Sequence, residues 1–231
     1  MNLLSLDSST KTFSLALARD EHIVKVRHAR LTGFLSASII GRIDRFLKSV
    51  GWSLKNVDAF VVGLGPGSFT GLRVGLATVK GLAAGTGKPV VGIPSLDAVA
   101  YKFRPARPLY IAVMTDARRQ LIYACLYRRH GKGLTRKTPY LLVPLSEFLA
   151  KINGDVFLTG DALGIYDNEI RQWMVQRTGG EVHLAAQKDW APQAQYLVPP
   201  ALERLRKKRY ANIEKLEPLY LYPKECQVLR S

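Results

Sequence analysis

The sequence predicts an α/β protein made of two similar lobes, each with the element order βββαβαβα. Short apolar runs of strand length alternate with stretches of helical periodicity, and this order repeats after the segment 102–108. An aspartate follows the first predicted strand of each half, Asp7 in one and Asp116 in the other. A glycine loop follows the fourth predicted strand, at 63–67 and again at Gly160. Duplicated α/β units of this kind form ligand sites near the carboxyl ends of their strands.

The first predicted lobe spans residues 1–103 and begins with three apolar runs separated by polar turns. Leu35, Ile39 and Ile43 then recur at helical spacing, so they fall on one face of a predicted helix. A buried strand and a helix rich in small residues follow, and Pro94 marks the start of the next helix. We expect strands at 2–7, 12–18, 22–28, 59–62 and 89–93, and helices at 34–50, 68–85 and 95–103.

The second predicted lobe spans residues 108–210 and is followed by a C-terminal tail at 211–231. Its elements repeat the order of the first lobe, and the proline-containing segment 102–108 is the natural boundary. We expect strands at 109–115, 121–127, 140–143, 155–159 and 181–184, and helices at 145–151, 164–177 and 192–208.

The loop after the fourth strand of the first lobe has the features of an anion-binding site. Gly65 and Gly67 permit positive φ and close backbone approach, and the helix that begins near Ser68 offers unpaired N–H groups. The loop lacks the Gly-Lys-Ser/Thr of a Walker A motif and does not fit G-x-G-x-x-G. The residues therefore predict a phosphate cradle that matches neither of these nucleotide motifs.

The helix after this loop is rich in small residues, among them Gly75, Gly81 and Gly85. Each interior glycine costs about 1 kcal/mol relative to alanine, so the pattern requires a reason. Two explanations stay open. The helix packs closely on its own sheet, or it forms a seam that the helix of a partner approaches closely.

The net charge is the second unusual property of the chain. The 34 Lys and Arg residues outnumber the 18 Asp and Glu residues, which gives +16. The segment 101–140 is strongly basic and contains Asp116 as its only acidic residue. Such a cluster is typical of a surface that binds a polyanion, most often a nucleic acid, although a solvated basic surface has the same composition. The candidate RNA contacts are Arg118, Arg119, Arg128, Arg129, Arg136 and Lys137.

The remaining composition points to an intracellular protein. Cys125 and Cys226 are too few and too far apart for a disulfide framework, which suggests a reducing compartment. The first residues lack the basic region and cleavage site of a signal peptide, and no apolar run reaches about 18 residues. We therefore expect a cytoplasmic location.

Four motifs carry a family resemblance. They are Leu-Asp-Ser-Ser around Asp7, Gly-Pro-Gly-Ser-Phe-Thr-Gly-Leu-Arg-Val-Gly-Leu-Ala from Gly65, Asp-Ala-Arg-Arg from Asp116, and Glu-Pro-Leu-Tyr-Leu-Tyr ending at Tyr222. Together they resemble the TsaB family, also called YeaZ, of the actin, sugar kinase and Hsp70 superfamily. The resemblance extends over the whole chain and implies two actin-like (ribonuclease H-like) lobes.

In that family the fold is retained but the chain is not itself the catalyst. The resemblance implies a subunit that binds and activates a TsaD-like enzyme, which carries the metal. That enzyme forms N6-threonylcarbamoyladenosine (t6A) at adenosine 37 of tRNAs that read ANN codons. A TsaE-like ATPase and tRNA are implied as further partners, and a homodimer is implied when the TsaD-like subunit is absent. The chain is expected to have no cofactor of its own, with ATP or ADP at the interface with partner subunits.

The first long helix and the small-residue helix form the partner surface in this family. The resemblance also implies that Asp7 takes the place of the phosphate-orienting aspartate of the superfamily's kinases, with Ser8 and Ser9 beside it. The chain departs from the family at 30–38, where relatives usually have His-Ser and then a proline within the helix. The implied interface residues are Leu35, Ile39, Ile43, Phe69, Leu72, Arg73, Gly75, Leu76, Val79 and Lys80.

The histidines argue against a catalytic metal in this chain. TsaD-like enzymes bind a metal through His-x-x-x-His on a helix, whereas no two of the 4 histidines here are four residues apart. No Ser-x-x-Lys or Gly-x-Ser-x-Gly sequence offers a nucleophile. Two alternatives to a noncatalytic subunit stay open, a stand-alone ATP-dependent phosphotransferase and a glycoprotease-like metallopeptidase.

Overall fold

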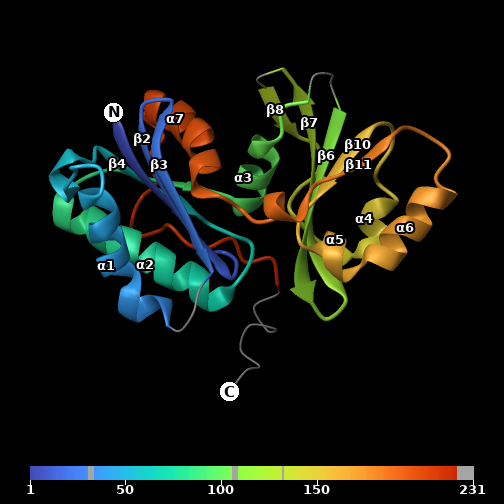
Figure 1. Ribbon diagram of the computed structural model, residues 1–231, viewed down its shortest axis with the longest axis horizontal. Coiled ribbons are helices and arrows are strands. Elements are labelled where there is room, and N and C mark those ends of the chain that lie inside the picture. The colour runs from blue at the N-terminus through green and yellow to red at the C-terminus, as the bar shows by residue number, and fades with distance from the viewer. Residues whose placement is uncertain (31–33, 106–108, 132, 223–231) are drawn as a thin grey trace. The chain divides into compact units, whose positions relative to one another are not determined.

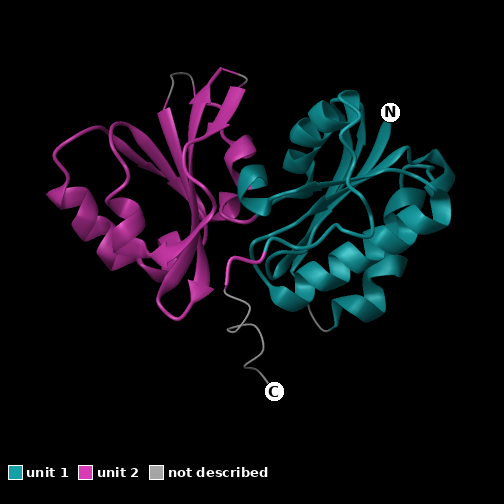
Figure 2. Ribbon diagram, turned by 180° about the vertical axis from the view of Figure 1, so that it is seen from behind, with its two compact units in different colours: residues 1–98, 192–219 teal, residues 99–191, 220–231 magenta. Residues whose placement is uncertain are grey.

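The chain divides into two compact units (Figure 2). The computed structural model describes residues 1–30, 34–105, 109–131 and 133–222. Unit 1 contains residues 1–98 and 192–219, and unit 2 contains residues 99–191 and 220–231. This division differs from the predicted lobes 1–103 and 108–210, because the segment 192–219 returns to unit 1.

Unit 1 is built on a five-stranded sheet with the strand order β3-β2-β1-β4-β5 (Figure 1). The first three strands are antiparallel, whereas β1, β4 and β5 are parallel. All of β4, and all of β1 after Asn2, is buried because both faces of the sheet are covered. The strands are β1 (Asn2–Asp7), β2 (Thr12–Arg19), β3 (His22–Arg30), β4 (Ala59–Gly63) and β5 (Val90–Ile93).

Helices α1 (Leu35–Lys48) and α2 (Phe69–Thr86) cover one face of this sheet (Figure 1). Their apolar residues recur at helical spacing and pack with Phe13, Leu15 and Leu17 of β2 in one hydrophobic cluster. The two helices therefore turn their apolar stripes toward the sheet and their opposite sides toward solvent.

The other face of the sheet is covered by the last helix, α7 (Val198–Arg206), and by the short 3-10 helix Ala194–Leu197. The sequence predicted a single helix over 192–208 in the second lobe. Helix α7 packs instead in one cluster with Leu3 and Val61 of unit 1. Without α7 this face would expose apolar side chains to water, which explains the return of the segment to unit 1.

Unit 2 repeats the sheet of unit 1 with the strand order β11-β10-β6-β7-β8. Strands β6, β7 and β8 are antiparallel, whereas β6, β10 and β11 are parallel. The predicted duplication is confirmed by this shared topology. The strands are β6 (Leu109–Arg118), β7 (Leu121–His130), β8 (Gly133–Arg136), β9 (Leu141–Pro144), β10 (Val156–Thr159) and β11 (Val182–Leu184).

The third strand of unit 2 differs from the prediction. The predicted strand 140–143 corresponds to β9, and the unpredicted β8 pairs with the other end of β7. Strand β8 is short and basic, so it lacks the apolar run by which strands are detected. Strands β6 and β7 also extend further than predicted, which places Asp116 inside β6 and shortens the turn after it.

The helices of unit 2 pack on one face of its sheet against residues such as Met114 and Ile122. The predicted helix 164–177 is divided at Tyr166, where a φ of −113° and a ψ of 33° end the first segment. These helices are α4 (Leu145–Leu149), α5 (Ala162–Ile165) and α6 (Asp167–Gln176), with α3 (Ser95–Lys102) and the 3-10 helices Leu54–Asn56 and Gln187–Asp189 completing the described set.

The segment after α7 runs along unit 1. Ala211 N donates a hydrogen bond to the Val90 carbonyl at 2.9 Å, and Leu219 N donates to the Leu64 carbonyl at 2.7 Å. The predicted tail 211–231 is therefore part of unit 1 as far as Leu219.

Some predicted features lie outside the described residues. They are residues 31–33 of the segment that departs from the family, residues 106–108 of the predicted boundary, and the end of the tail from 223, with Cys226. Among the helices that are described, none is long and apolar enough to cross a membrane.

Candidate functional site

Asp7 lies at the end of β1 and is fully buried. Its Oδ1 accepts hydrogen bonds from the backbone N of Ser9 at 2.9 Å and from the Ser9 hydroxyl at 2.6 Å. Its Oδ2 accepts a hydrogen bond from the Ser95 hydroxyl at 2.6 Å. Burial raises the pKa of Asp7 above its usual 3.8, while these hydrogen bonds oppose the rise. The carboxyl group thus holds the β1–β2 turn in place.

Ser95 connects this carboxyl group to the glycine loop. Its hydroxyl accepts a hydrogen bond from Gly65 N at 3.0 Å, and its backbone N donates to the Gly65 carbonyl at 2.7 Å. A Cβ atom on Gly63 would overlap the Asp7 carboxylate. Sequence patterns do not reveal this role, because Ser95 is far from Asp7 along the chain and serves locally as the start of α3.

The β1–β2 turn packs directly against the first turn of α2. Ser68 N donates to the Ser9 carbonyl at 2.7 Å, and the Ser8 hydroxyl donates to the Gly71 carbonyl at 2.8 Å. A Cβ atom on Gly67 would overlap the Ser9 carbonyl oxygen. One on Gly71 would overlap the Ser8 carbonyl oxygen. The glycines are therefore required for an internal contact between the turn and the helix.

The structure brings the residues of the predicted phosphate cradle together, but it closes the cradle with the chain's own turn. Ser8 and Ser9 are buried, and the Ser9 carbonyl accepts the hydrogen bond from Ser68 N. The Ser68 hydroxyl caps α2 by accepting a hydrogen bond from Gly71 N at 3.2 Å. Two N–H groups at the start of α2 thus already have acceptors. The grouped residues are Asp7, Ser8, Ser9, Gly65, Gly67 and Ser68.

Seven residues of the implied interface are buried in unit 1 and are not available to a partner. They face the sheet because the apolar stripe of an amphipathic helix packs on the core. Gly75 lies on the side of α2 that faces the sheet, because a Cβ atom there would overlap the Ser8 hydroxyl. The close packing of α2 on its own unit therefore explains this glycine. The seven are Leu35, Ile39, Ile43, Leu72, Gly75, Leu76 and Val79.

The other three implied interface residues reach the surface of α2. Phe69 is 42% exposed, and the Arg73 guanidinium lies 3.8 Å from the centre of its ring. Lys80 is half-buried, and its Nζ donates a hydrogen bond to the Glu214 carbonyl at 3.3 Å. Phe69 and Arg73 therefore remain candidates for contact with a partner.

The solvent side of α1 and α2 carries the small residues of α2 that the sequence pattern singled out, together with Phe34 and Ile40, which it did not. Phe34 is 88% exposed and Ile40 is 56% exposed. Gly81 and Gly85 have open space around the position of a Cβ atom. Ala77, Gly81 and Gly85 follow one another at intervals of four residues, and this spacing places them on one side of α2, opposite the buried stripe. We call this set the exposed helix face: Phe34, Ile40, Phe69, Arg73, Ala77, Gly81, Ala84 and Gly85.

The predicted tRNA contacts fall at two separate ends of unit 2. Arg118 and Arg119 lie at the β6–β7 turn, whereas Arg128 pairs with Tyr110 near the opposite end of β7. At about 3.3 Å per residue, the length of β7 between these ends is about 23 Å. Arg136 and Lys137 are exposed near the Arg128 end. The structure therefore forms two basic groups and not one continuous patch.

Arg129 is not available to a phosphate. It is only 1% exposed, and its guanidinium lies 5.7 Å from the centre of the Tyr101 ring. Its Nε and Nη1 are buried without a hydrogen-bond partner among the described residues. Burial and the nearby Arg104 both lower the pKa of Arg129. By contrast, the Arg128 guanidinium stacks 4.6 Å from the centre of the Tyr110 ring and remains half-exposed.

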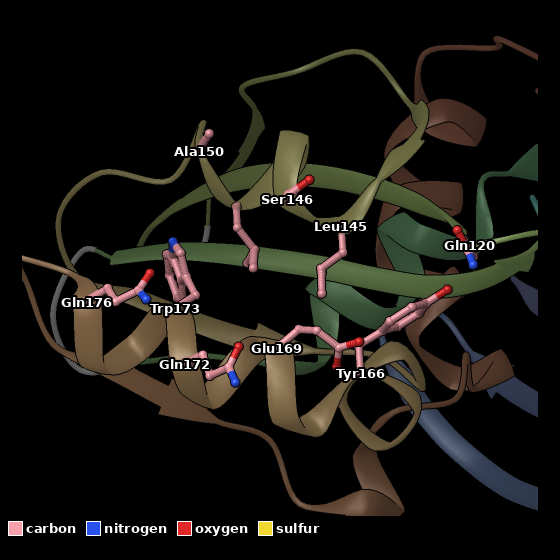
Figure 3. Close-up of a pocket in the computed structure, with 10 residues that line it drawn as sticks. Gln120, Leu145, Ser146, Ala150, Tyr166, Glu169, Gln172, Trp173 and Gln176 are labelled. Carbon is pink, nitrogen blue, oxygen red and sulfur yellow. The ribbon is translucent and has the colours of Figure 1, made fainter.

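A groove of about 580 Å³ lies between α4 and α6 of unit 2 (Figure 3). Leu145 and Leu149 of α4 provide apolar lining, and Tyr166 and Trp173 provide aromatic lining from the side of α6. Glu169 is the one charged residue among those that line it. The groove is therefore unsuited to a phosphate group. None of the predicted site residues lines it.

No group of three His, Cys, Asp or Glu side chains within the described part of the chain is arranged to hold a metal ion. His28 lies in β3, where its Nδ1 is 2.9 Å from the Ser14 hydroxyl.

Comparison with known proteins identifies a matching family model and relatives of this chain. A family model described as TsaD, tRNA N6-adenosine threonylcarbamoyltransferase, matches residues 35–222. The tRNA threonylcarbamoyladenosine biosynthesis protein TsaB of Escherichia coli (strain K12) is 26% identical over 226 residues, which cover 96% of this chain and 94% of the relative.

The solved structures support the fold. YeaZ from Pseudomonas aeruginosa matches with a TM-score of 0.78 and 25% identity, covering 95% of this chain and 99% of that chain. The Lmo2764 protein from Listeria monocytogenes, assigned as an N-acetylmannosamine kinase, matches with a TM-score of 0.51 and 11% identity over 90% of this chain and 99% of that chain. At that identity the similarity concerns the fold alone, and it confirms the predicted actin-like lobes. The chain therefore belongs to the TsaD family and, within it, to the TsaB/YeaZ branch.

Proposed function

We propose that this chain is a noncatalytic subunit that binds and activates a TsaD-like enzyme in the formation of t6A at position 37 of tRNAs that read ANN codons. The name of its relative from Escherichia coli, tRNA threonylcarbamoyladenosine biosynthesis protein TsaB, supports the pathway. Modification of tRNA in the cytoplasm agrees with the location that we expect for the chain.

The closed glycine loop is the observation that carries the noncatalytic role. The sequence predicted that the glycine loop and the start of the helix after it would receive a phosphate group. Here the Ser9 carbonyl accepts a hydrogen bond from Ser68 N, and the buried Ser8 packs on Gly71. A carbonyl oxygen in this place would disfavour a phosphate, because the oxygen end of the carbonyl dipole is partially negative and the phosphate is an anion. We therefore propose that the chain has no cofactor of its own and that ATP or ADP binds only at an interface with partner subunits.

The exposed helix face is the proposed contact with the TsaD-like subunit. Gly81 and Gly85 leave open space along α2, which lets the backbone of another helix approach closely. Phe34 and Ile40 on α1 supply exposed apolar side chains, and such residues contribute strongly when an interface buries them. The same face would pair two copies of the chain when the TsaD-like subunit is absent.

The test is a pair of glycine substitutions that differ only in position. Gly81→Leu fills the open space on α2, and it should strengthen the helix because leucine has a higher helix propensity than glycine. Gly179→Leu fills similar open space in unit 2 and is the matched control. We expect Gly81→Leu to weaken co-purification with a TsaD-like protein by about tenfold or more and to lower t6A formation by the mixture. Gly179→Leu should leave both unchanged.

Three results would contradict the proposed interface or the proposed role. Normal pairing of a folded Gly81→Leu variant would place the interface elsewhere. ATP turnover by the isolated chain would favour the alternative of a stand-alone phosphotransferase, and peptide cleavage that a chelator abolishes would favour the metallopeptidase.

We propose that tRNA and a TsaE-like ATPase complete the assembly, and that exposed cations of unit 2 contact the tRNA backbone. Each phosphate contact should contribute about 0.9 to the slope of log affinity against log salt on duplex regions. Neutralising Arg128, Arg136 and Lys137 to Gln, or Arg118 and Arg119 to Gln, tests the two basic groups separately. We expect a flatter slope for the group that binds tRNA, with TsaD pairing unchanged. Equal slopes for both variants and the parent would leave these residues as solvated surface.

A further inference from the structure

Strand β3 forms the edge of the unit 1 sheet (Figure 1). Every residue of this strand except Ala29 is exposed, and Ile23, Val24 and Val26 are 42%, 42% and 41% exposed. Among the described residues β2 is the only strand that pairs with β3, so the outer backbone groups of β3 face no described strand. A long exposed edge with β-branched side chains is a template for another strand.

The register with β2 sorts the β3 side chains onto two faces. Lys25 and Arg27 lie opposite Leu17 and Leu15, on the side that α1 and α2 cover. Val26 lies opposite Ala16, on the other side of the sheet. Ile23 lies on the same side as Val26, and His28 and Arg30 follow on that side toward the end of the strand. Since neighbouring strands align their side chains face by face, an added strand would meet Lys25 and Arg27 on one face and the aliphatic Ile23 and Val26 on the other.

The charge of β3 helps to decide which kind of partner can bind at this edge. The strand contains Lys25, Arg27 and Arg30 and no acidic residue. A second copy of β3 would place like charges opposite one another, which is unfavourable. Single-stranded RNA is bound by a basic groove together with stacking of its bases on aromatic side chains, and β3 has no Phe, Tyr or Trp. Its aromatic rings are those of His22 and His28, and His28 Nδ1 lies 2.9 Å from the Ser14 hydroxyl. RNA would also leave the aliphatic side chains and the outer backbone groups without partners.

We propose that the outer edge of β3 binds an extended acidic segment of another protein, in which acidic and aliphatic residues alternate. The segment adds a strand to the unit 1 sheet through backbone hydrogen bonds. Its carboxylates lie beside Lys25 and Arg27, and its aliphatic side chains lie beside Val26 and Ile23. This inference concerns β3 and does not depend on the exposed helix face or on the proposed role in t6A formation.

The probe is a labelled peptide of about eight residues, the length of a typical strand, that alternates glutamate and valine. Its binding to the full chain is measured by fluorescence anisotropy. One control peptide has the same composition in two blocks, four glutamates followed by four valines. Another is the alternating peptide with methyl groups on every second backbone nitrogen, which removes hydrogen-bond donors. We expect both control peptides to bind at least about tenfold more weakly, because neither can match the faces and the backbone of β3 together.

Charge variants locate the binding on the chain. Arg27→Glu should weaken binding of the alternating peptide by about tenfold, since it places like charges side by side. Arg27→Lys should retain binding, which separates the charge from any effect on folding. Lys55→Glu changes an exposed cation of the 3-10 helix Leu54–Asn56 and is the matched control for net charge, with binding expected within about twofold of the parent.

The proposal is overturned if the three peptides bind equally, if the alternating peptide does not bind, or if Lys55→Glu weakens its binding as much as Arg27→Glu does. It is also overturned in favour of RNA if a labelled uridine oligonucleotide binds and loses affinity in Arg27→Glu while the alternating peptide does not bind.

Discussion

Two turns occupy the same position in the two duplicated sheets, and they are used in different ways. The β1–β2 turn of unit 1 follows Asp7 and is buried at Ser8 and Ser9. The β6–β7 turn of unit 2 follows Asp116 and exposes Arg118 and Arg119 to solvent. The β1–β2 turn therefore packs inside unit 1, whereas the equivalent β6–β7 turn exposes positively charged side chains to solvent.

The hydrogen bonds explain this difference. Asp7 accepts three hydrogen bonds from Ser9 and Ser95, and these tie its turn to the glycine loop. Asp116 instead accepts a bond from Arg118 N at 3.0 Å, within its own turn, and its backbone N donates to Asp161 Oδ1 at 2.9 Å. The Tyr222 hydroxyl donates a hydrogen bond to the Ala117 carbonyl at 2.7 Å, beside the basic turn. The side chains of Arg118 and Arg119 remain exposed, unlike those of Ser8 and Ser9.

Removal of the Asp7 carboxylate should have the largest effect on stability. Asp7→Ala leaves three buried donors without their acceptor, and each such loss costs about 1–3 kcal/mol. We expect the free energy of unfolding in urea to fall by about 3 kcal/mol or more. Asp116→Ala is the matched change in unit 2 and should cost about 1 kcal/mol, because its side chain is partly solvated. Equal effects of the two substitutions would contradict the comparison.

Substitution by alanine should have opposite effects on stability at two glycines of α2, one that contacts the β1–β2 turn and one that faces solvent. Gly71→Ala places a Cβ atom on the Ser8 carbonyl oxygen, and we expect a loss of about 2–3 kcal/mol as the turn and helix separate. Gly81→Ala meets no atom and should raise stability by about 1 kcal/mol through helix propensity. Thermal or urea unfolding of the two variants measures the difference. A stabilising Gly71→Ala substitution would show that the turn does not close the loop in solution.

Periodicity predicted the sheets and the apolar stripes, but it did not distinguish internal from external use of a surface. Leu72 and Leu76 lie on α2 as predicted, yet they pack on unit 1, because a stripe that faces the core and one that faces a partner have the same pattern. The same alternation in β7 places Arg129 on the buried face with Tyr127, and this signal was available from the sequence.

Long-range contacts were beyond the sequence patterns. The bond between Ser95 and Asp7 joins positions 88 residues apart, and no local rule links them. The placement of α7 in unit 1 likewise depends on which sheet face lacks a cover, which is a property of the assembled layers.

Acid titration should report on the buried carboxyl group of Asp7. Burial raises the pKa of Asp7 above 3.8. Between pH 3.8 and this raised pKa, the Asp7 carboxyl group is protonated in the folded state and ionised in the unfolded state. The free energy of unfolding therefore falls as the pH rises from 3.8 through the raised pKa of the folded state. The buried carboxyl of Asp161 has a raised pKa as well and acts in the same direction.

The variant Asp7→Asn cannot ionise and should lose less stability over this pH range than the parent. We expect the stability of Asp7→Asn relative to the parent to increase with pH in urea denaturation series. A parallel pH dependence of the parent and Asp7→Asn would show that Asp7 does not titrate in this range.

The smallest effect should come from the backbone of the exposed turn. Arg118, Arg119 and Gln120 have φ values of 68°, 51° and 60°, a left-handed conformation that disfavours side chains with a Cβ atom. Glycine adopts it without that penalty, so Arg119→Gly should raise the free energy of unfolding by about 0.5–1 kcal/mol. Arg136→Gly removes the same side chain from strand β8 and should lower stability slightly, since glycine weakens strands. Equal losses of unfolding free energy in the two variants would mean that the β6–β7 turn stores no backbone strain. The β6–β7 turn would then differ from the buried β1–β2 turn in charge alone.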